Sequence, residues 1–572
     1  MMRKKLYIFS HPLLSASIGK GTISSILNHS LITFSSGASN EAEMRRQLLA
    51  EYIVSMIRAV KIEDKSVESN WIEDAALPML ASIAYCRSDA YAPPLSEKTR
   101  NRFRTSLMSV FAHVLSDFAG YSYSCNLLSK FTPDAVPMDA EVTRTKDEAL
   151  SIMWNLLKKG NSDNFEQKAP CQALALLYSL VIIQLYNGEP DAVSVLEELK
   201  LCGDKLVKHS KTNDSDMDAS EVLVELLLSL ISKPSAVLRK ATQHVFSAFM
   251  QKVTTGGLKL MTDILGSSEG LRGQQELFDQ EPEGRDEMNI EDEDNMDSDV
   301  EVIDMDGEEL HLNDHLNASS DETSASDSND ASESNSSDSD NDPEDEALNT
   351  ALAQILGTHN LKNGAGDVDS DSDADMTDSE MIALDSKLVE IFSQRKKAPN
   401  KKQEQKDAKE TIVSFKSRVL DLLEIYVKKQ AVNPLAFSLL LPLLQLIRTT
   451  KAKPLADKAF SIIQAFFKSF KAAKKAESSS LPSSNITIAS QLEFLKAIHL
   501  EVSQDPSHMF AKAASTASLL VASSLLHVDK ESVQEIATVY RDSQVRWARG
   551  EVRIQASFFV EWINWCQSLA RP

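Results

Sequence analysis

The stretch TIVSFKSRVLDLLEIYVKKQ, residues 411–430, distributes apolar and polar side chains with the period of an α-helix. Apolar side chains recur at spacings of three and four residues and form one stripe: Ile412, Phe415, Val419, Leu422, Leu423 and Tyr426. The opposite face is polar and comprises Ser414, Ser417, Arg418, Asp421, Glu424 and Lys428. A stripe of this width is typical of a helix that packs on a helical core. The stretch therefore predicts a packed helix.

Further helices are predicted on the N-terminal side of this stretch. The first should begin at Asn40, with Glu43 three positions later as in a capping box. Periodic segments then follow one another to about residue 280, and several end in Gly or Lys-Pro, which are helix stops. No Asn-Gly or Asp-Gly turn lies between alternating runs, so strands are not predicted. The sequence predicts an all-α fold of the HEAT- or armadillo-like α-solenoid type, with a non-repetitive helical bundle as the alternative.

Prolines mark the predicted helix boundaries after residue 430. Asn433 and Pro434 occupy cap and first-turn positions of a new helix, Pro442 should kink it, and Pro454 should begin the next. A terminal helix is predicted in SFFVEWINWCQSL, with one face formed by Phe558, Trp562, Trp565 and Leu569. We expect this helix to pack on the array, with the docking of a partner as the alternative.

Residues 286–386 contain 33 acidic residues and one lysine, a net charge of −32, whereas the rest of the 572-residue chain has a net charge of +8. Like-charge repulsion and scarce apolar groups leave such a segment without a core. The sequence thus predicts a long disordered acidic insert, either between two arrays or within one. The predicted division is residues 1–39 of uncertain character, 40–280 helical repeats, 281–377 the insert, 378–410 an amphipathic helix and Lys-rich linker, and 411–572 C-terminal helical repeats.

Three groups of basic residues are candidates for binding or targeting. One has the composition of a nuclear localisation signal that also contacts nucleic acid: Arg395, Lys396, Lys397, Lys401 and Lys402. Two stripes at helical spacing suit contacts with a phosphate backbone: Lys468, Lys471 and Lys475, and then Arg546, Arg549 and roughly Arg553. For each group the alternative is a solvated charged linker or helix face.

The acidic segment has three possible uses: a solvating linker, a binder of basic proteins, or a switch controlled by phosphorylation. Five hydroxyl groups in it precede an acidic residue by three positions, the pattern that acidophilic kinases favour: Ser337, Ser339, Ser370, Ser372 and Thr377. His311 and His315 are four apart, but they lack the glutamate of an HExxH zinc motif, and we ascribe their spacing to chance.

No catalytic signature is identified, since the sequence contains no GxxxxGK[ST] or HExxH motif. No cofactor, metal or small-molecule substrate is predicted. The five cysteines are scattered, which favours small buried side chains over disulfides or a zinc site. The most apolar run, residues 173–186, is too short for a bilayer, so no membrane association is expected. The N-terminus resembles a signal peptide, but His11 and Pro12 interrupt its apolar part.

Residues 378–450 read DSEMIALDSKLVEIFSQRKKAPNKKQEQKDAKETIVSFKSRVLDLLEIYVKKQAVNPLAFSLLLPLLQLIRTT and follow the acidic tract. This sequence resembles the DNA polymerase V (polymerase phi) family, to which Myb-binding protein 1a belongs. The resemblance is strongest to the fungal members of the family. The resemblance implies a helical repeat protein of the nucleus and nucleolus, active in ribosomal RNA gene transcription and ribosome biogenesis. It implies ribosomal DNA or pre-ribosomal RNA and basic nuclear proteins, such as ribosomal proteins and histones, as partners. Family members are usually longer, so we expect this chain to lack the family's N-terminal part.

The leading hypothesis is a nucleolar scaffold that binds nucleic acid and basic proteins without catalysis. A DNA-directed DNA polymerase, as the family name suggests, is disfavoured because no strand-borne pair of carboxylates is predicted to hold catalytic metal ions. The other alternative is a karyopherin-like transport adaptor, which is also a helical array.

Overall fold

The computed structural model describes residues 39–59, 71–85, 94–115, 121–130, 136–160, 165–207, 214–278, 378–476 and 488–570. Within these residues every regular element is a helix and there is no strand, which confirms the predicted all-α class. The chain divides into two compact units. The larger unit joins Met1–Phe278 to Ala408–Pro572, and the smaller is Asp279–Asp407.

The helices before the acidic segment are short to medium in length. They are α4 (Ser39–Ala59), the π-helix η2 (Ile72–Ala76), α5 (Leu77–Tyr85), α6 (Glu97–Val114), α7 (Tyr121–Leu128), α8 (Ala140–Gly160), α9 (Phe165–Tyr186), α10 (Ala192–Val207), α11 (Asp214–Ser232), α12 (Ala236–Phe249), the 3-10 turn η5 (Met250–Lys252), α13 (Thr255–Gly266) and α14 (Leu271–Phe278).

After it, one long helix is followed by further short to medium helices. They are α16 (Asp378–Lys429), α17 (Pro434–Phe437), α18 (Leu440–Thr449), α19 (Lys453–Ala476), α20 (Ile488–Val502), α21 (His508–Val528), the 3-10 turn η6 (Lys530–Ser532), α22 (Val533–Ala548) and α23 (Ala556–Leu569).

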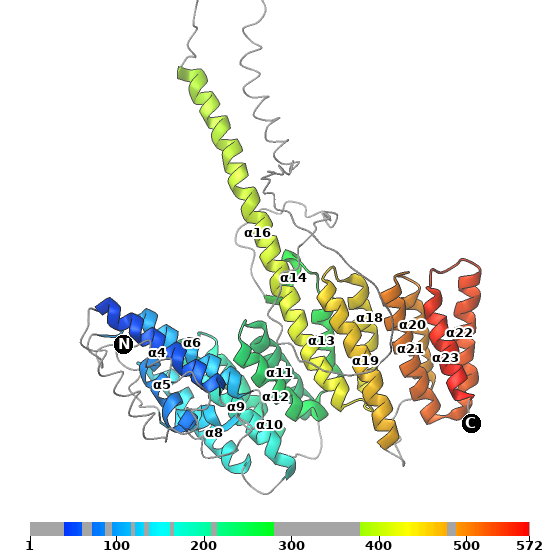
Figure 1. Cartoon of the computed structure of the whole chain (residues 1–572), viewed down its shortest axis with the longest axis horizontal. Coiled ribbons are helices and arrows are strands. Elements are labelled where there is room, and N and C mark those ends of the chain that lie inside the picture. The colour runs from blue at the N-terminus through cyan, green and yellow to red at the C-terminus, as the bar shows by residue number, and fades with distance from the viewer. Residues whose placement is uncertain are drawn as a thin grey trace, which may run out of the picture. The chain divides into compact units, whose positions relative to one another are not determined.

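From α11 onward the helices of the larger unit form two layers. In one layer α11 contacts α13, α13 contacts α18, α18 contacts α20, and α20 contacts α22. In the other, α12 lies against α16, α16 against α19, α19 against α21 and α21 against α23. Figure 1 shows these helices side by side across the unit. Stacked helical pairs of this kind form an α-solenoid, so the predicted architecture is confirmed.

Short polar side chains begin several of these helices. Ser235, Thr254 and Ser507 each accept a hydrogen bond from the backbone N–H three residues later. Such a cap satisfies one of the N–H groups that a helix start leaves without a partner, and contributes about 1 kcal/mol. The predicted start at Asn433 is confirmed as well, because its side chain accepts from Leu435 N at 3.0 Å.

Pro442 interrupts the helix that Asn433 begins, as expected. α17 ends at Phe437 and α18 begins at Leu440, so the break lies about one turn before the proline. Proline has no N–H to donate to the carbonyl four residues earlier, and its ring crowds that carbonyl. Pro454 is the second residue of α19, where a missing N–H is tolerated.

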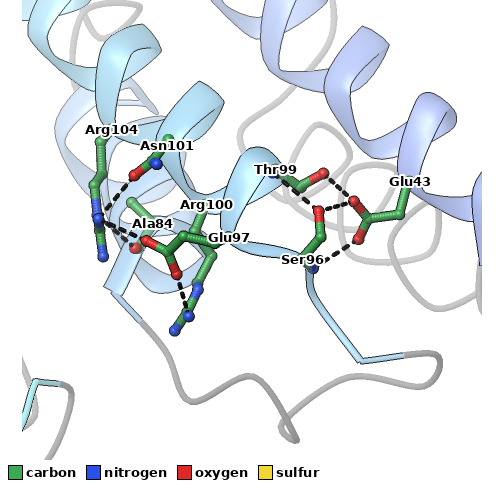
Figure 2. A network of polar contacts seen from close by, with 8 residues as sticks. All are labelled: Glu43, Ala84, Ser96, Glu97, Thr99, Arg100, Asn101 and Arg104. Atoms are coloured by element: carbon green, nitrogen blue, oxygen red, sulfur yellow. Dashed lines mark hydrogen bonds and ion pairs between the residues drawn. The ribbon is translucent and has the colours of Figure 1, made fainter.

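The first helix starts differently from the prediction. α4 begins at Ser39, one residue before Asn40, and the Glu43 carboxylate bonds another helix. Its Oε1 accepts from Ser96 N at 2.9 Å and its Oε2 from the Thr99 hydroxyl at 2.6 Å, while the Ser96 hydroxyl also donates to Oε2 (Figure 2). Burial raises the pKa of this carboxyl, but these hydrogen bonds and Arg46 outweigh it and lower the pKa overall. Glu43 therefore joins α4 to the start of α6.

α16 is longer than the stretch that predicted it. The helix is 52 residues long and includes the basic run that was expected to be a linker. Residues 400–410, NKKQEQKDAKE, consist mainly of strong helix formers, which explains why helicity does not stop there. A hydrogen bond of 2.8 Å from Gln403 to Asp407, one turn later, supports this part of the helix.

The most apolar helices lie in the core. Two described helices are long and apolar enough to cross a membrane, Gln167–Tyr186 and His508–Val528, and most of each is buried in the array. The length argument made for residues 173–186 is thus wrong, because α9 already begins at Phe165. Three of the cysteines, Cys125, Cys171 and Cys202, are buried and free, as predicted.

Candidate nucleic-acid interface

Basic side chains of α16 bind the C-terminal ends of helices that precede the acidic segment. Arg418 Nη1 donates to the carbonyls of Ile231, Ser232 and Lys233, at 2.7, 2.9 and 3.1 Å. These carbonyls end α11, where the helix dipole is negative and intrahelical donors are missing. Arg418 therefore satisfies three acceptors at once and fixes α16 against α11.

Lys416 binds the C-terminal end of α13. Its side chain is 3% exposed, donates to Ser267 O at 2.7 Å and pairs with Glu269 at 3.3 Å. Burial lowers the pKa of the Lys416 ammonium, and Glu269 offsets this only in part. Aromatic contacts add to the junction, since Phe278 lies 5.6 Å from Phe415 between ring centroids.

Basic side chains also contact the ends of other helices of the larger unit. Lys240 donates to Ala112 O at 2.8 Å, and the His244 ring lies 2.7 Å from Leu115 O, both at the end of α6. Arg104 reaches Ala84 O at the end of α5, next to the Glu97 carboxylate and Asn101 (Figure 2). These basic side chains have structural partners, so positive charge that is available to a ligand must come from other residues.

The contacts of α16 also decide where the acidic segment belongs. α13 and α14 precede it, α16 follows it, and α13 and α16 touch through Lys416. The larger unit joins both halves of the chain. The described helices on either side of the acidic segment thus belong to one compact unit, which favours a long connection within one array over two separate arrays.

The predicted lysine stripe lies at the C-terminal end of α19. Lys468, Lys471 and Lys475 are all exposed, and so is Lys474. No acidic residue occurs between Lys458 and the end of the helix. None of the four C-terminal lysines forms an ion pair with a residue that the structure describes. This face of α19 is therefore solvated and carries only positive charge.

Two more exposed lysines, Lys428 and Lys429, end α16 and are not among the predicted binding residues. α16 and α19 are both antiparallel to α18, which runs between them in sequence, and they are therefore parallel to each other (Figure 1). Lys458 of α19 donates to Ser417 O of α16 at 2.7 Å, which sets their register.

This register brings the first lysine of the α19 group level with the lysines that end α16. Lys468 is ten residues beyond Lys458, and Lys428 is eleven beyond Ser417. At a rise of about 1.5 Å per residue, both lie roughly 15 Å from the contact, in the same direction. We call the combined set the lysine edge: Lys428, Lys429, Lys468, Lys471, Lys474 and Lys475. Only a register read from the fold could have found it.

The predicted arginine stripe is different. Arg546 and Arg549 are exposed, yet both lie close to Glu551, at 3.8 and 3.7 Å. Arg541 of the same helix pairs with Asp542 at 3.0 Å. Acidic neighbours thus offset much of the charge on this surface, and the structure does not join it to the lysine edge.

Other predicted residues have a more limited description. The backbone of the basic cluster at residues 395–402 belongs to α16, but the side chains of this cluster are outside the part that the structure describes. The predicted phosphorylation positions and the histidine pair at 311 and 315 also lie outside them. These predictions stay untested.

The terminal helix packs on the array, as expected. Phe558 and Trp562 are buried, and α23 contacts α21. The predicted stripe is only partly correct, because Trp565 is half-buried and Leu569 is 48% exposed. Tyr540 of α22 stacks on Trp562 with ring centroids 3.9 Å apart.

A buried polar network that the sequence did not reveal lies beside these rings. His499 Nδ1 is 2.8 Å from Ser543 Oγ, and its Nε2 is 3.1 Å from Ser518 Oγ. Ser518 is 2.6 Å from the Tyr540 hydroxyl. Burial lowers the pKa of the imidazole to about 3, so His499 is neutral at physiological pH. We assign it a structural role, since both ring nitrogens are satisfied within the core.

Fold and surface together define an all-α repeat protein with a polyanionic segment and a polycationic edge. Residues 14–427 match the DNA polymerase phi family model. The match covers more than half of the chain, and the protein therefore belongs to the DNA polymerase phi family.

Three relatives illustrate the similarity. The rDNA transcriptional regulator pol5 of Schizosaccharomyces pombe is 29% identical over 91% of this chain and 53% of its own length. The rDNA transcriptional regulator POL5 of Saccharomyces cerevisiae is 27% identical over 76% of this chain and 43% of its own. Human Myb-binding protein 1A is 31% identical over 54% of this chain and 22% of its own. The predicted resemblance to the family, fungal members included, is confirmed.

This chain spans about half the length of the fungal relatives that it matches. No solved structure matches it.

Proposed function

We propose that this protein is a scaffold that regulates transcription of the ribosomal RNA genes without catalysis. The observation that carries the proposal is the similarity, over 91% of the chain, to a protein named as an rDNA transcriptional regulator. The second fungal relative has the same name, and the human relative is named for binding Myb. None of these names describes a polymerase, which supports a binding role.

The physical properties of the chain suit such a role. A solenoid offers a long surface on rigid helices, and its stability depends on contacts between neighbouring repeats. The lysine edge offers positive charge to nucleic acid, such as ribosomal DNA or pre-ribosomal RNA. The acidic segment, with a net charge of −32, offers negative charge to basic nuclear proteins such as ribosomal proteins and histones.

The compartment is part of the proposal. Regulation of ribosomal RNA genes takes place in the nucleus, and we propose nucleolar residence with a further role in ribosome biogenesis. The basic cluster Arg395, Lys396, Lys397, Lys401 and Lys402 serves as the nuclear localisation signal. Phosphorylation of the acidic segment, at positions such as Ser337 and Ser370, adds negative charge and strengthens its binding to basic partners.

Depletion of the protein from its cells and pulse-labelling of nascent pre-ribosomal RNA test the function. Under the proposal, synthesis of pre-ribosomal RNA changes at least twofold, whereas a control messenger RNA does not, and re-expression of the protein restores it. Unchanged synthesis would overturn the proposal. A transport adaptor, the competing function, predicts instead that imported cargo accumulates in the cytoplasm.

A further inference from the structure

We propose that the lysine edge binds the phosphate backbone of duplex DNA without reading its sequence. This inference rests on the proposed function and deepens it by naming a surface and a ligand. Its six members come from the last turns of two neighbouring helices, α16 and α19: Lys428, Lys429, Lys468, Lys471, Lys474 and Lys475.

The charge of the edge is available because, among the residues that the structure describes, few acidic groups oppose it. On α16, Glu424 pairs with Lys428 at 2.6 Å. Asp421 pairs with Lys458, about ten residues before the edge on α19. Lys429 donates to the Ser247 hydroxyl of α12, which leaves its positive charge uncompensated. One of the six lysines is therefore neutralised by a described acidic group, and the edge keeps a charge of about +5.

The spacing of the lysines suits a duplex. Lys468 and Lys475 are separated by two helical turns, or about 10 Å, and packed helix axes lie about 8–10 Å apart. A duplex carries one charge per roughly 1.7 Å of its axis, so a patch of this size faces several phosphates. Flexible ammonium groups act as point charges and do not select bases, which predicts binding that is indifferent to sequence.

The phenylalanines of α19 disfavour a single strand as the ligand. Phe466 and Phe470 are buried and pack against Phe437, at 5.3 and 5.9 Å between centroids. Proteins that hold single strands stack bases on exposed aromatic rings. No aromatic side chain of α16 or α19 is among the exposed large hydrophobic side chains of the described residues. The edge thus has charge without a stacking surface.

The test measures binding of the full chain to a labelled duplex of about 30 base pairs, by fluorescence anisotropy over a range of salt concentrations. The variant Lys468→Gln/Lys471→Gln/Lys474→Gln/Lys475→Gln removes four charges from the edge. A matched variant removes four exposed lysines elsewhere: Lys98→Gln/Lys259→Gln/Lys496→Gln/Lys512→Gln. Circular dichroism confirms that both variants keep the helical content of the unmodified chain.

We expect the edge variant to lose at least tenfold in affinity near 0.1 M salt. The slope of log K against log[salt] should become shallower by about 3 to 4, near 0.9 per lost phosphate contact. The matched variant should stay within about twofold of the unmodified chain. Two duplexes of unrelated sequence should bind alike.

Equal binding by the edge variant and the unmodified chain would overturn the proposal, and so would the absence of duplex binding by the unmodified chain. A stronger affinity for single-stranded RNA that depends on the lysine edge would also overturn the proposal, because it would identify single-stranded RNA as the ligand in place of duplex DNA. These results leave the proposed function standing if labelling of pre-ribosomal RNA still responds to depletion, because a scaffold also reaches genes through proteins. The two proposals can therefore fail separately.

Discussion

Arg418 of α16 donates from Nη1 to the carbonyl oxygen of Ile231 at 2.7 Å, although 187 residues separate the two in sequence. The contact joins the first helix after the acidic segment to the end of a helix that precedes it. A cation at the negative end of a helix dipole, shared by three carbonyls, is a favourable geometry. It explains how one compact unit accommodates a connection of about a hundred residues.

Removal of this contact should destabilise the larger unit. We expect Arg418→Met to lower the free energy of unfolding in urea by roughly 2 to 3 kcal/mol, because three carbonyls lose a charged donor. Arg541→Met is the control, since Arg541 is exposed and pairs only with its neighbour Asp542, and it should cost less than about 0.5 kcal/mol. Equal effects of the two changes would show that the Arg418 contact does not hold the halves together.

The acidic segment should be dispensable for folding of the array. Deletion of residues 286–370, with a short Gly/Ser linker in their place, should leave the unfolding transition of the larger unit cooperative. The shorter connection should even stabilise it by about 1 kcal/mol, since loop closure costs roughly 0.6 kcal/mol per doubling of length. A Gly/Ser segment of the original length serves as the control. Loss of the cooperative transition in calorimetry would mean that the segment is part of the folded array.

His499 makes the stability of the C-terminal helices sensitive to acid. The folded chain keeps this imidazole neutral down to a pKa of about 3, whereas an unfolded chain protonates it near the ordinary value of 6.5. Its contribution is therefore complete above pH 6.5 and is lost as pH falls toward 3, by at most about 1.4 kcal/mol per pH unit.

His499→Gln should flatten the dependence of unfolding free energy on pH between about 6 and 4, as measured by urea titration. His508→Gln, at an exposed position, should leave that dependence unchanged. If both variants followed the pH profile of the unmodified chain, the buried histidine would not be the sensitive group.

Nuclear entry should depend on the basic cluster at residues 395–402. Replacement of Arg395, Lys396, Lys397, Lys401 and Lys402 by Ala should move a tagged full chain from the nucleolus to the cytoplasm, as seen by fluorescence microscopy. The control replaces Lys98, Lys259, Lys496 and Lys512 by Ala and should keep the nucleolar signal. Nucleolar signal that survives the cluster change would locate the signal elsewhere in the chain.

The periodicity of the sequence predicted which face of a single helix is buried, but it did not predict contacts between helices. The apolar stripe from Ile412 to Tyr426 is buried as predicted, because burial follows from the pattern along a single helix. The same pattern assigned Arg418 only to the polar face and offered no reason for Lys416 to be buried, because their partners lie more than 140 residues away. The lysine edge depends on helix register, and His499 on hydroxyls from two other helices.

Helix boundaries at prolines were also predictable, because they depend on the local sequence. Pro434, Pro442 and Pro454 mark boundaries because proline lacks an N–H wherever it occurs. Helix length was harder to predict, since the Lys-rich part of α16 is polar enough for a linker and also rich in helix formers. Composition alone does not decide between those states.

Crosslinking of the tagged full chain to chromatin, followed by sequencing of the bound DNA, tests whether the protein occupies the ribosomal RNA genes. We predict enrichment at these genes over other transcribed genes, with a several-fold loss in the variant that lacks Lys468, Lys471, Lys474 and Lys475. Equal recovery of ribosomal and other genes would contradict regulation of ribosomal RNA genes by this protein.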